Sequence, residues 1–472
     1  MKRYLYKYNI YYDKFITNKC LKNNYKYIIF LFIFFFMVHY NKILRKNYIK
    51  LNKNLININK NANLTFLNKL ANNINIGIYI YNLKNGGTQR MTALLINYLY
   101  NIRIFKLYLF IQKNKEENEY IIPKEIKRIK IQDCLMKILI KEIHKNRIDI
   151  LIYQFPNYNG INLLNKLKKI KIIFYLHYCF FYWIYYDFLY FKSLYKSYQD
   201  SKYVISLVPL ENNFLFKKWG INSILMNNFI TYNYNYVIPS NLSTKVILMI
   251  GRGQDRLKRY ELGIQSMEYI IEEVSKCEMK IISNITQNFY IKDLVNDYNL
   301  EKYINFIEYT STPEEYFKKA SLHIFPTISE SFGLVLSEAK LYGIPNILLG
   351  LDYVSISNGG IINIYDDTPE SISKVAIKIL VENEYKIKLG IDSRKSMRKF
   401  NNEYLFKKWI KLLLSIYNGQ EYYQIIMKEN ENLYRKNLSS IIEKQLVLLK
   451  KRKNLSFTIN ELENFTYISQ SI

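Results

Sequence analysis

Short apolar segments alternate with segments of helical periodicity along most of this chain. The apolar runs, rich in β-branched and aromatic side chains, are residues 74–81, 148–153, 172–176, 246–250, 279–282, 323–325 and 347–349. Strands that alternate with helices form parallel sheets covered by helices on both faces. The pattern therefore predicts an α/β fold.

The length of 472 residues exceeds what a single hydrophobic core accommodates. A break at Pro239, Ser240 and Asn241 separates two series of strands. We therefore expect two doubly wound, Rossmann-like domains that face a cleft. The expected divisions are an N-terminal domain at 74–243, a C-terminal domain at 244–400, a crossover helix at 401–419 and a helical extension without site chemistry at 420–472.

The N-terminus has the pattern of a membrane anchor. A basic leader occupies residues 1–26, and an unbroken apolar run follows at residues 27–38. The run is shorter than the ~20 residues of an ordinary membrane span but matches the apolar core of a signal sequence. No small-residue cleavage site follows, so we expect a signal anchor at 27–40 and a stem or linker at 41–73; a buried helix is the alternative. The anchor predicts a single-pass protein of the endomembrane system (ER or Golgi), with its orientation open because lysines flank both sides.

The formal net charge of +29 would attract phosphates, nucleic acid or anionic membrane. Lys and Asn are spread through every segment, however, and no nucleic-acid-binding motif is present, so we expect no nucleic-acid partner. The four cysteines, Cys20, Cys134, Cys179 and Cys277, lie far apart, so no pair has the spacing of a metal site or redox motif.

The most specific motif is PTISESFGLVLSEA at residues 326–339, which is followed by Gly-Ile-Pro at 343–345. Glu330 lies in the loop after an apolar strand, and Gly333 precedes a predicted helix whose free N–H groups favour an anionic phosphate. Glu338 then falls in the second turn of that helix. Two surface glutamates at this spacing are the alternative, which the glycines around them make less favourable.

A second motif joins an apolar strand to basic residues. Residues 246–250 end in Gly251 and Arg252, and Lys258 follows. Two cations at the end of a buried strand can neutralise a diphosphate. Arg256 or Arg259 could take the place of Lys258, and a chance pair in so basic a chain is the bland alternative.

Together these motifs resemble the signature of the retaining glycosyltransferases of family 4, and the resemblance covers residues 74–417. Two acidic residues separated by seven others are typical of that family, as Glu330 and Glu338 are here. The resemblance implies that Glu330 contacts sugar hydroxyls and that Glu338 contacts the ribose. Gly333, Leu334 and Val335 complete the implied donor site. Arg252 and Lys258 are the implied diphosphate ligands.

The first domain carries weaker signals of the same resemblance. Gly86 and Gly87 are similar to a glycine loop that faces the cleft in the family. His177 matches the position of a cleft histidine that contacts the sugar, which implies a catalytic role beside Glu330; a buried core histidine is the alternative. Asn228 is expected near the hinge, and the loop at 309–311 is a candidate for backbone contacts with the base. The residues after Glu338, Lys340 among them, depart from the small apolar residues usual in the family.

The resemblance implies a transferase of the two-lobed GT-B class that takes a hexose-type sugar from a nucleotide sugar, either a UDP- or a GDP-sugar. No cofactor and no metal are expected, and the expected partners are the nucleotide sugar, a glycan or lipid-linked acceptor, and the membrane. A sugar phosphorylase or epimerase would share the architecture. A non-catalytic, membrane-anchored carbohydrate-binding protein on the same fold is the alternative from another class.

Overall fold

The computed structural model describes residues 74–84, 86–113, 119–132, 136–154, 157–252, 256–283, 289–310, 312–419 and 438–453. The leader at 1–26, the anchor at 27–40 and the stem at 41–73 lie outside the described residues, as do Cys20 and Cys134. Within the described ranges, no helix combines the length and the apolarity that crossing a membrane requires. The membrane anchor stays a prediction.

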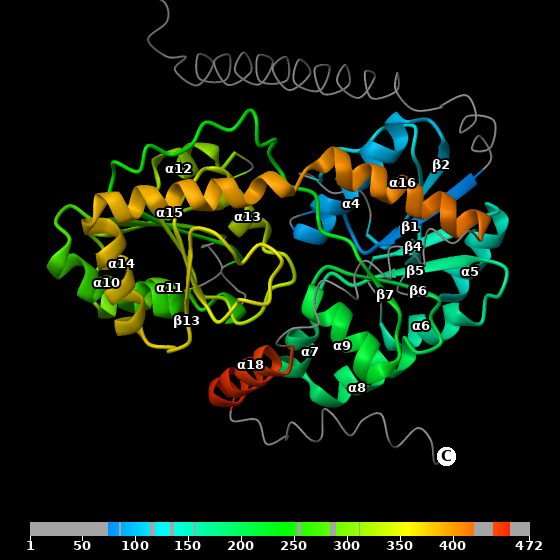
Figure 1. Ribbon diagram of the computed structural model, residues 1–472. Helices are drawn as coiled ribbons and strands as arrows, with labels where there is room; N and C mark the ends of the chain where they lie inside the picture. Colours follow the sequence, from blue (N-terminus) through cyan, green and yellow to red (C-terminus); the bar gives the residue numbers. More distant parts are fainter. Residues whose placement is uncertain are drawn as a thin grey trace, which may run out of the picture. The chain divides into compact units, whose positions relative to one another are not determined.

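The first sheet has seven parallel strands in the order β3-β2-β1-β4-β5-β6-β7. These strands are β1 Ile74–Ile80, β2 Phe105–Ile111, β3 Lys127–Lys130, β4 Ile150–Tyr153, β5 Lys171–Tyr175, β6 Tyr203–Ser206 and β7 Ser223–Leu225. The helices between them are α4 Gly87–Asn101, α5 Met136–Lys145, α6 Tyr158–Asn165, α7 Phe180–Tyr186, α8 Phe188–Ser197 and α9 Pro209–Trp219 (Figure 1). Aromatic side chains fill its core, where the rings of Tyr79 and Tyr153 stack with centroids 4.7 Å apart.

The second sheet has six parallel strands in the order β10-β9-β8-β11-β12-β13. They are β8 Val246–Ile250, β9 Glu278–Ile282, β10 Ile304–Ile307, β11 Leu322–Phe325, β12 Asn346–Leu349 and β13 Ile361–Ile364. The helices of this half are α10 Tyr260–Glu273, α11 Phe289–Asp297, α12 Glu314–Lys319, α13 Leu334–Leu341, α14 Pro369–Val381 and α15 Asn383–Ser396. Aliphatic side chains of the strands and of α10, α11 and α14 form one buried core. The predicted α/β class with two Rossmann-like sheets is confirmed.

The predicted apolar runs do not include β2, β3, β6, β7, β10 and β13, and for some of these strands the sequence pattern explains the omission. β3 and β13 lie at sheet edges and have partly exposed side chains, so they lack the continuous apolar run of a central strand. β7 has only three residues. Short or edge strands carry too little pattern to be recognised without their neighbours.

In each sheet, the strand order reverses between two neighbouring strands. The reversal falls between β1 and β4 in the first sheet and between β8 and β11 in the second. Ligands of open parallel sheets bind outside the carboxyl ends of the strands at such a switch point. The loops after β1, β4, β8 and β11 are therefore the places where a site is expected.

Helix α16, Asn402–Asn418, returns the chain to the first lobe, where it lies beside α4 (Figure 1). The Asn402 side chain accepts a hydrogen bond from Ile230 N–H and donates one to Ile230 O, both at 2.8 Å. Its aromatic face packs on the first lobe: Phe406 contacts Tyr98, and Trp409 meets the ring of Tyr175 with centroids 5.5 Å apart. α16 thus anchors the hinge segment and closes one side of the first lobe.

Trp409 gives a direct test of this packing. It is 1% exposed, so Trp409→Ala should lower the free energy of unfolding by about 3–5 kcal/mol, as lost burial and a cavity add together. Tyr404→Ala on the same helix is the control, because Tyr404 is 61% exposed and its loss should cost less than ~0.5 kcal/mol. Chemical denaturation measures both, and equal losses in the two variants would contradict this account of α16.

Candidate active site

A cavity of about 310 Å³ lies where the loops after the switch-point strands meet. One wall comes from the first lobe and includes the residue after β1, the start of α4 and the segment after β5. The other wall comes from the second lobe and includes the residues after β8 and β11 and the start of α13. The lining residues that the sequence singles out are Gly86, Gly87, His177, Asn228, Arg252, Lys258, Tyr309, Glu330, Leu334 and Val335.

Lys258 and Glu330 form an ion pair on the second-lobe wall. Lys258 ends a short 3-10 helix, Arg256–Lys258, while Glu330 follows β11, so the pair joins two loops that are 72 residues apart in sequence. Each side chain is about one-sixth exposed, with 18% for Lys258 and 17% for Glu330. The Lys258 ammonium also lies 5.3 Å from the ring centroid of Phe325. The pair therefore presents an oriented carboxylate and a cation to the cavity.

Lys258, rather than its basic neighbours, reaches the cavity. Arg259 turns toward Asp367, with which it forms an ion pair, and Arg256 is exposed and does not line the cavity. Arg252 also lines it. Gly251 precedes Arg252 and lies close to Lys258. A Cβ at this position would lie 2.9 Å from Tyr260 Oη and 3.4 Å from Lys258 Cδ, so little space is left for a side chain.

Gly333 shapes the start of α13. It has φ +77°, a left-handed conformation that glycine adopts without strain, and it caps the helix. Leu334 and Val335 then line the cavity with the first turn of α13. Because first-turn N–H groups lack intrahelical acceptors and carry the positive end of the helix dipole, this wall favours an anion.

Glu338 occupies a different place from Glu330. It is 2% exposed and is not among the residues that line the cavity. Its Oε1 atom is 2.8 Å from Nη1 of Arg90, on α4 of the first lobe. Burial disfavours the charged form of Arg90, but the charge of Glu338 and the nearby Tyr120, Tyr232 and Tyr309 together raise the pKa of Arg90. The sequence places the two glutamates near one spot, whereas the structure puts only Glu330 on the cavity wall.

The glycine loop brings the first lobe close to α13. A Cβ on Gly87 would lie 3.1 Å from Cδ1 of Leu334, so a side chain here would press on the opposite wall. Gly86 caps α4 and Gly87 is its first residue, and the first turn of α4 lines the same cavity as the first turn of α13. The N-termini of two helices thus contribute to one cavity.

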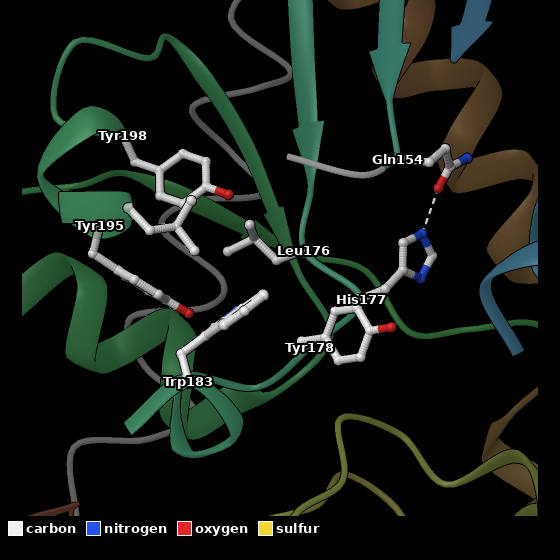
Figure 2. A pocket seen from close by; sticks show the side chains of 8 residues that line it. Gln154, Leu176, His177, Tyr178, Trp183, Tyr195 and Tyr198 are labelled. Atoms are coloured by element: carbon white, nitrogen blue, oxygen red, sulfur yellow. Dashed lines mark hydrogen bonds between the residues drawn. The ribbon is translucent and has the colours of Figure 1, made fainter. Parts of the chain in front are cut away.

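His177 follows β5 and is held on three sides. Its Nε2 donates to Oε1 of Gln154 (Figure 2). Its ring centroid lies 4.1 Å from that of Tyr175, and its carbonyl accepts from Oγ of Ser331 in the other lobe. An amide oxygen only accepts, so Nδ1 carries no proton. Burial lowers the pKa of His177 to about 3, so the ring is neutral near pH 7.

A small hollow lies behind His177. It has a volume of about 20 Å³ and is lined by Trp183, Tyr195 and Tyr198 together with the backbone side of His177 (Figure 2). That volume holds about one water molecule. The hollow is too small for a sugar. The larger cavity, which His177 also lines, is therefore the candidate binding site.

The remaining predicted residues are placed as follows. Asn228 is 6% exposed, and its Oδ1 accepts from Tyr175 Oη at 3.1 Å. Tyr309 lines the cavity, whereas Ser311 lies outside the described residues. Lys340, which departs from the family pattern, is buried and donates to the carbonyls of Ile356 (2.6 Å) and Asn358. It therefore ties the loop after β12 to α13 and takes no part in the cavity.

Comparison with known proteins finds a family match for part of the chain. Residues 236–355 match the family model described as glycosyl transferases group 1. That span contains Arg252, Lys258, Glu330 and Glu338, the residues on which the resemblance depends. This segment is therefore similar to the group 1 glycosyltransferases. It forms much of the second lobe and contributes that lobe's whole wall of the cavity.

A curated relative matches part of the chain, and solved structures share its fold. An uncharacterized glycosyltransferase of Haemophilus influenzae is 23% identical over 146 residues, which cover 30% of this chain and 40% of the relative's length. Sucrose-phosphate synthase from Thermosynechococcus elongatus superposes with a TM-score of 0.62 at 16% identity, over 74% of this chain and 100% of that one. Anabaena HepE, solved with UDP and glucose, gives a TM-score of 0.57 at 12% identity, over 72% and 99%. The two-lobed GT-B fold expected from the sequence is confirmed.

Two contacts of this site are not apparent from the sequence. Arg90 stands in the same Gly-Gly-Thr-Gln-Arg segment as the glycine loop, and its place one turn into α4 is the signal that could have found it. Gln154 directly follows the apolar strand β4, at the edge where ligand-facing residues are expected. Neither pattern identifies the partner, Glu338 or His177, because both partners lie in distant segments.

The buried His177 predicts a specific dependence of stability on pH. Its folded pKa of about 3 lies below the ordinary 6.5, so between these values the unfolded state binds a proton that the folded state does not. His177 therefore lowers the free energy of unfolding as pH falls below 6.5, by up to about 1.4 kcal/mol per pH unit. In urea unfolding at pH 7.5, 5.5 and 4.5, His177→Gln should lose less stability on acidification than the parent. His144→Gln, at an exposed position of α5, should follow the parent; if His177→Gln does too, the ring is not held neutral.

Proposed function

We propose that this chain is a glycosyltransferase that transfers a hexose-type sugar from a nucleotide sugar, either a UDP- or a GDP-sugar, to a glycan or lipid-linked acceptor. We further propose that the reaction retains the anomeric configuration and needs no metal ion. The observation that carries the proposal is the Lys258–Glu330 pair, which lines one cavity together with the starts of α4 and α13. An anion site beside an oriented carboxylate suits a sugar diphosphate.

The charges on the cavity wall support a role in stabilising the leaving diphosphate. Lys258 and Arg252 supply full positive charges, and the first turns of α4 and α13 supply N–H dipoles. Such groups are fixed before the reaction, so they stabilise negative charge that develops on the leaving group without reorganising. In this proposal they do the work that a divalent ion does in other transferases.

Glu330 and His177 lie where they could bind the transferred sugar. Glu330 can accept hydrogen bonds from sugar hydroxyls, and Lys258 holds its carboxylate in place. The neutral ring of His177 has Nδ1 left as an acceptor, which suits a sugar hydroxyl better than it suits a phosphate. Retention is proposed from the family resemblance, in which the same two positions contact the donor sugar.

Glu338 is proposed to act on the ribose from the second turn of α13. In the structure it is buried and paired with Arg90, which lines the cavity, so ribose binding requires the Glu338 side chain to become accessible from the cavity. Glu338 must therefore become accessible before it can bind the donor, whereas Glu330 already lines the cavity. The variants of the two residues should accordingly differ in donor affinity.

Alanine variants test the two glutamates. If both groups bind the donor in the transition state, either Glu330→Ala or Glu338→Ala should cost on the order of 2–4 kcal/mol, a roughly 30- to 1,000-fold loss of rate. Release of nucleotide from a panel of nucleotide sugars is the measurement. Glu315→Ala, an exposed carboxylate on α12 away from the cavity, is the control. A Glu330→Ala variant as active as the parent would remove Glu330 from the site, and a parent that binds donors but releases no nucleotide would favour the non-catalytic carbohydrate-binding protein.

The charge assignment predicts behaviour with chelators. We expect transfer to continue in excess EDTA, because Arg252 and Lys258 are proposed to neutralise the diphosphate. Arg252→Ala should lower kcat by about 10- to 100-fold and weaken donor binding less, since charge builds up mainly in the transition state. Activity that disappears with EDTA and returns with manganese would refute metal independence.

A further inference from the structure

Helix α18, Leu438–Lys453, contacts the second lobe from the C-terminal extension (Figure 1). Leu446 and Leu449 are fully buried, and Gln445, only 1% exposed, donates to Gly350 O and to Asp352 Oδ1. Gly350 has φ +65°, and a Cβ there would lie 2.5 Å from Leu448 Cδ1. The loop after β12 is thus shaped to receive this helix.

The contacts of α18 end in a buried arginine. The side chain of Arg452 is 3% exposed. Its Nε and Nη2 donate to the two carboxylate oxygens of Asp367 at 2.6 and 2.8 Å. Its Nη1 donates to Ile328 O and its Nη2 to Leu349 O, both at 3.3 Å. The planar guanidinium matches this spread of acceptors, which a lysine ammonium could not bridge.

Asp367 connects Arg452 to the basic segment after β8. It also forms an ion pair with Arg259, the residue next to Lys258. Burial alone would raise the pKa of Asp367, but hydrogen bonds and charge from Arg452 and Arg259 hold it below its ordinary value. Asp367 is therefore an anion fixed between two cations.

Ile328 connects Arg452 to the loop after β11 at residues 326–331, which carries Glu330 and is called the signature loop below. Its N–H donates to Leu257 O at 2.9 Å, while its carbonyl accepts from Arg452. Leu257 precedes Lys258, and Ile328 stands two residues before Glu330. One guanidinium thus braces both backbone segments that carry the Lys258–Glu330 pair.

We propose that Arg452 is a positioning residue for the donor site, supplied by the C-terminal helix α18. It does not line the cavity, and at least four hydrogen bonds engage its donors, so it acts through Ile328 and Asp367 rather than on the donor. The effect on turnover rests on the proposed function, whereas the effect on the signature loop does not. The extension at 420–472, which the sequence suggests has no site chemistry, thereby contributes to the site.

Hydrogen exchange followed by mass spectrometry on the full chain tests the positioning directly. Arg452→Ala should speed exchange at the amides of Ile328 and Glu330, which donate to Leu257 O and to Tyr353 Oη. Lys451→Ala is the matched control, because Lys451 is 65% exposed and contacts only the exposed Asp366, at 3.8 Å, among the residues described. Unchanged exchange at residues 326–331, or a uniform rise across the whole lobe, would overturn the proposal.

Kinetics with a nucleotide sugar give the second readout. We expect kcat to fall about 10- to 100-fold in Arg452→Ala, an intermediate fall in Arg452→Lys, and parental turnover in Lys451→Ala, because small displacements of reacting groups are costly. Arg452→Lys also keeps the test available if Arg452→Ala does not fold. A parent that turns over and an Arg452→Ala variant that matches it would refute the positioning role. A parent that turns over no nucleotide sugar would instead refute the proposed function, and hydrogen exchange alone would then decide the role of Arg452.

Discussion

Parallel strand pairing decides where chemistry can occur in this protein. Every strand pair within the two described sheets is parallel, so the segments that follow the strands emerge at one edge of each sheet. At the two switch points, neighbouring connections run to opposite faces and leave room between them. Gly86, Arg252 and Glu330 reach one cavity for this reason, although they are far apart in sequence.

The parts of the fold that the sequence predicts are those encoded by local patterns. Central strands such as β8 are continuous apolar runs, and Gly333 marks the start of α13 because a left-handed residue is needed there. Edge strands such as β3 lack that pattern, because solvent covers part of their surface. The sequence therefore predicts the class and both lobes, but the predicted runs leave out edge strands such as β3 and also the inner strands β2 and β6.

The candidate site likewise combines residues that a local motif identifies with contacts that depend on distant parts of the chain. The spacing of Glu330 and Glu338 can be read directly from the sequence, but the side-chain environment of each cannot. Glu338 is buried by Arg90, and Arg452 meets Ile328 across 124 residues of sequence. A basic residue in so lysine-rich a chain gives no sign of its partner, because its charge is common and its burial is set by tertiary packing.

Glu330 and Glu338 are paired with cations from different lobes, and this affects what happens to each pair when the lobes move. Lys258 belongs to the same lobe as Glu330, so that pair persists whatever the first lobe does. Arg90 belongs to the other lobe, so Glu338 keeps its cation only while α4 and α13 stay close. Separation would leave a buried carboxylate unpaired, at a cost of about 3–5 kcal/mol unless water or a ligand hydroxyl replaces Arg90. The two lobes can therefore separate without this cost only if water or a ligand hydroxyl replaces Arg90 beside the Glu338 carboxylate.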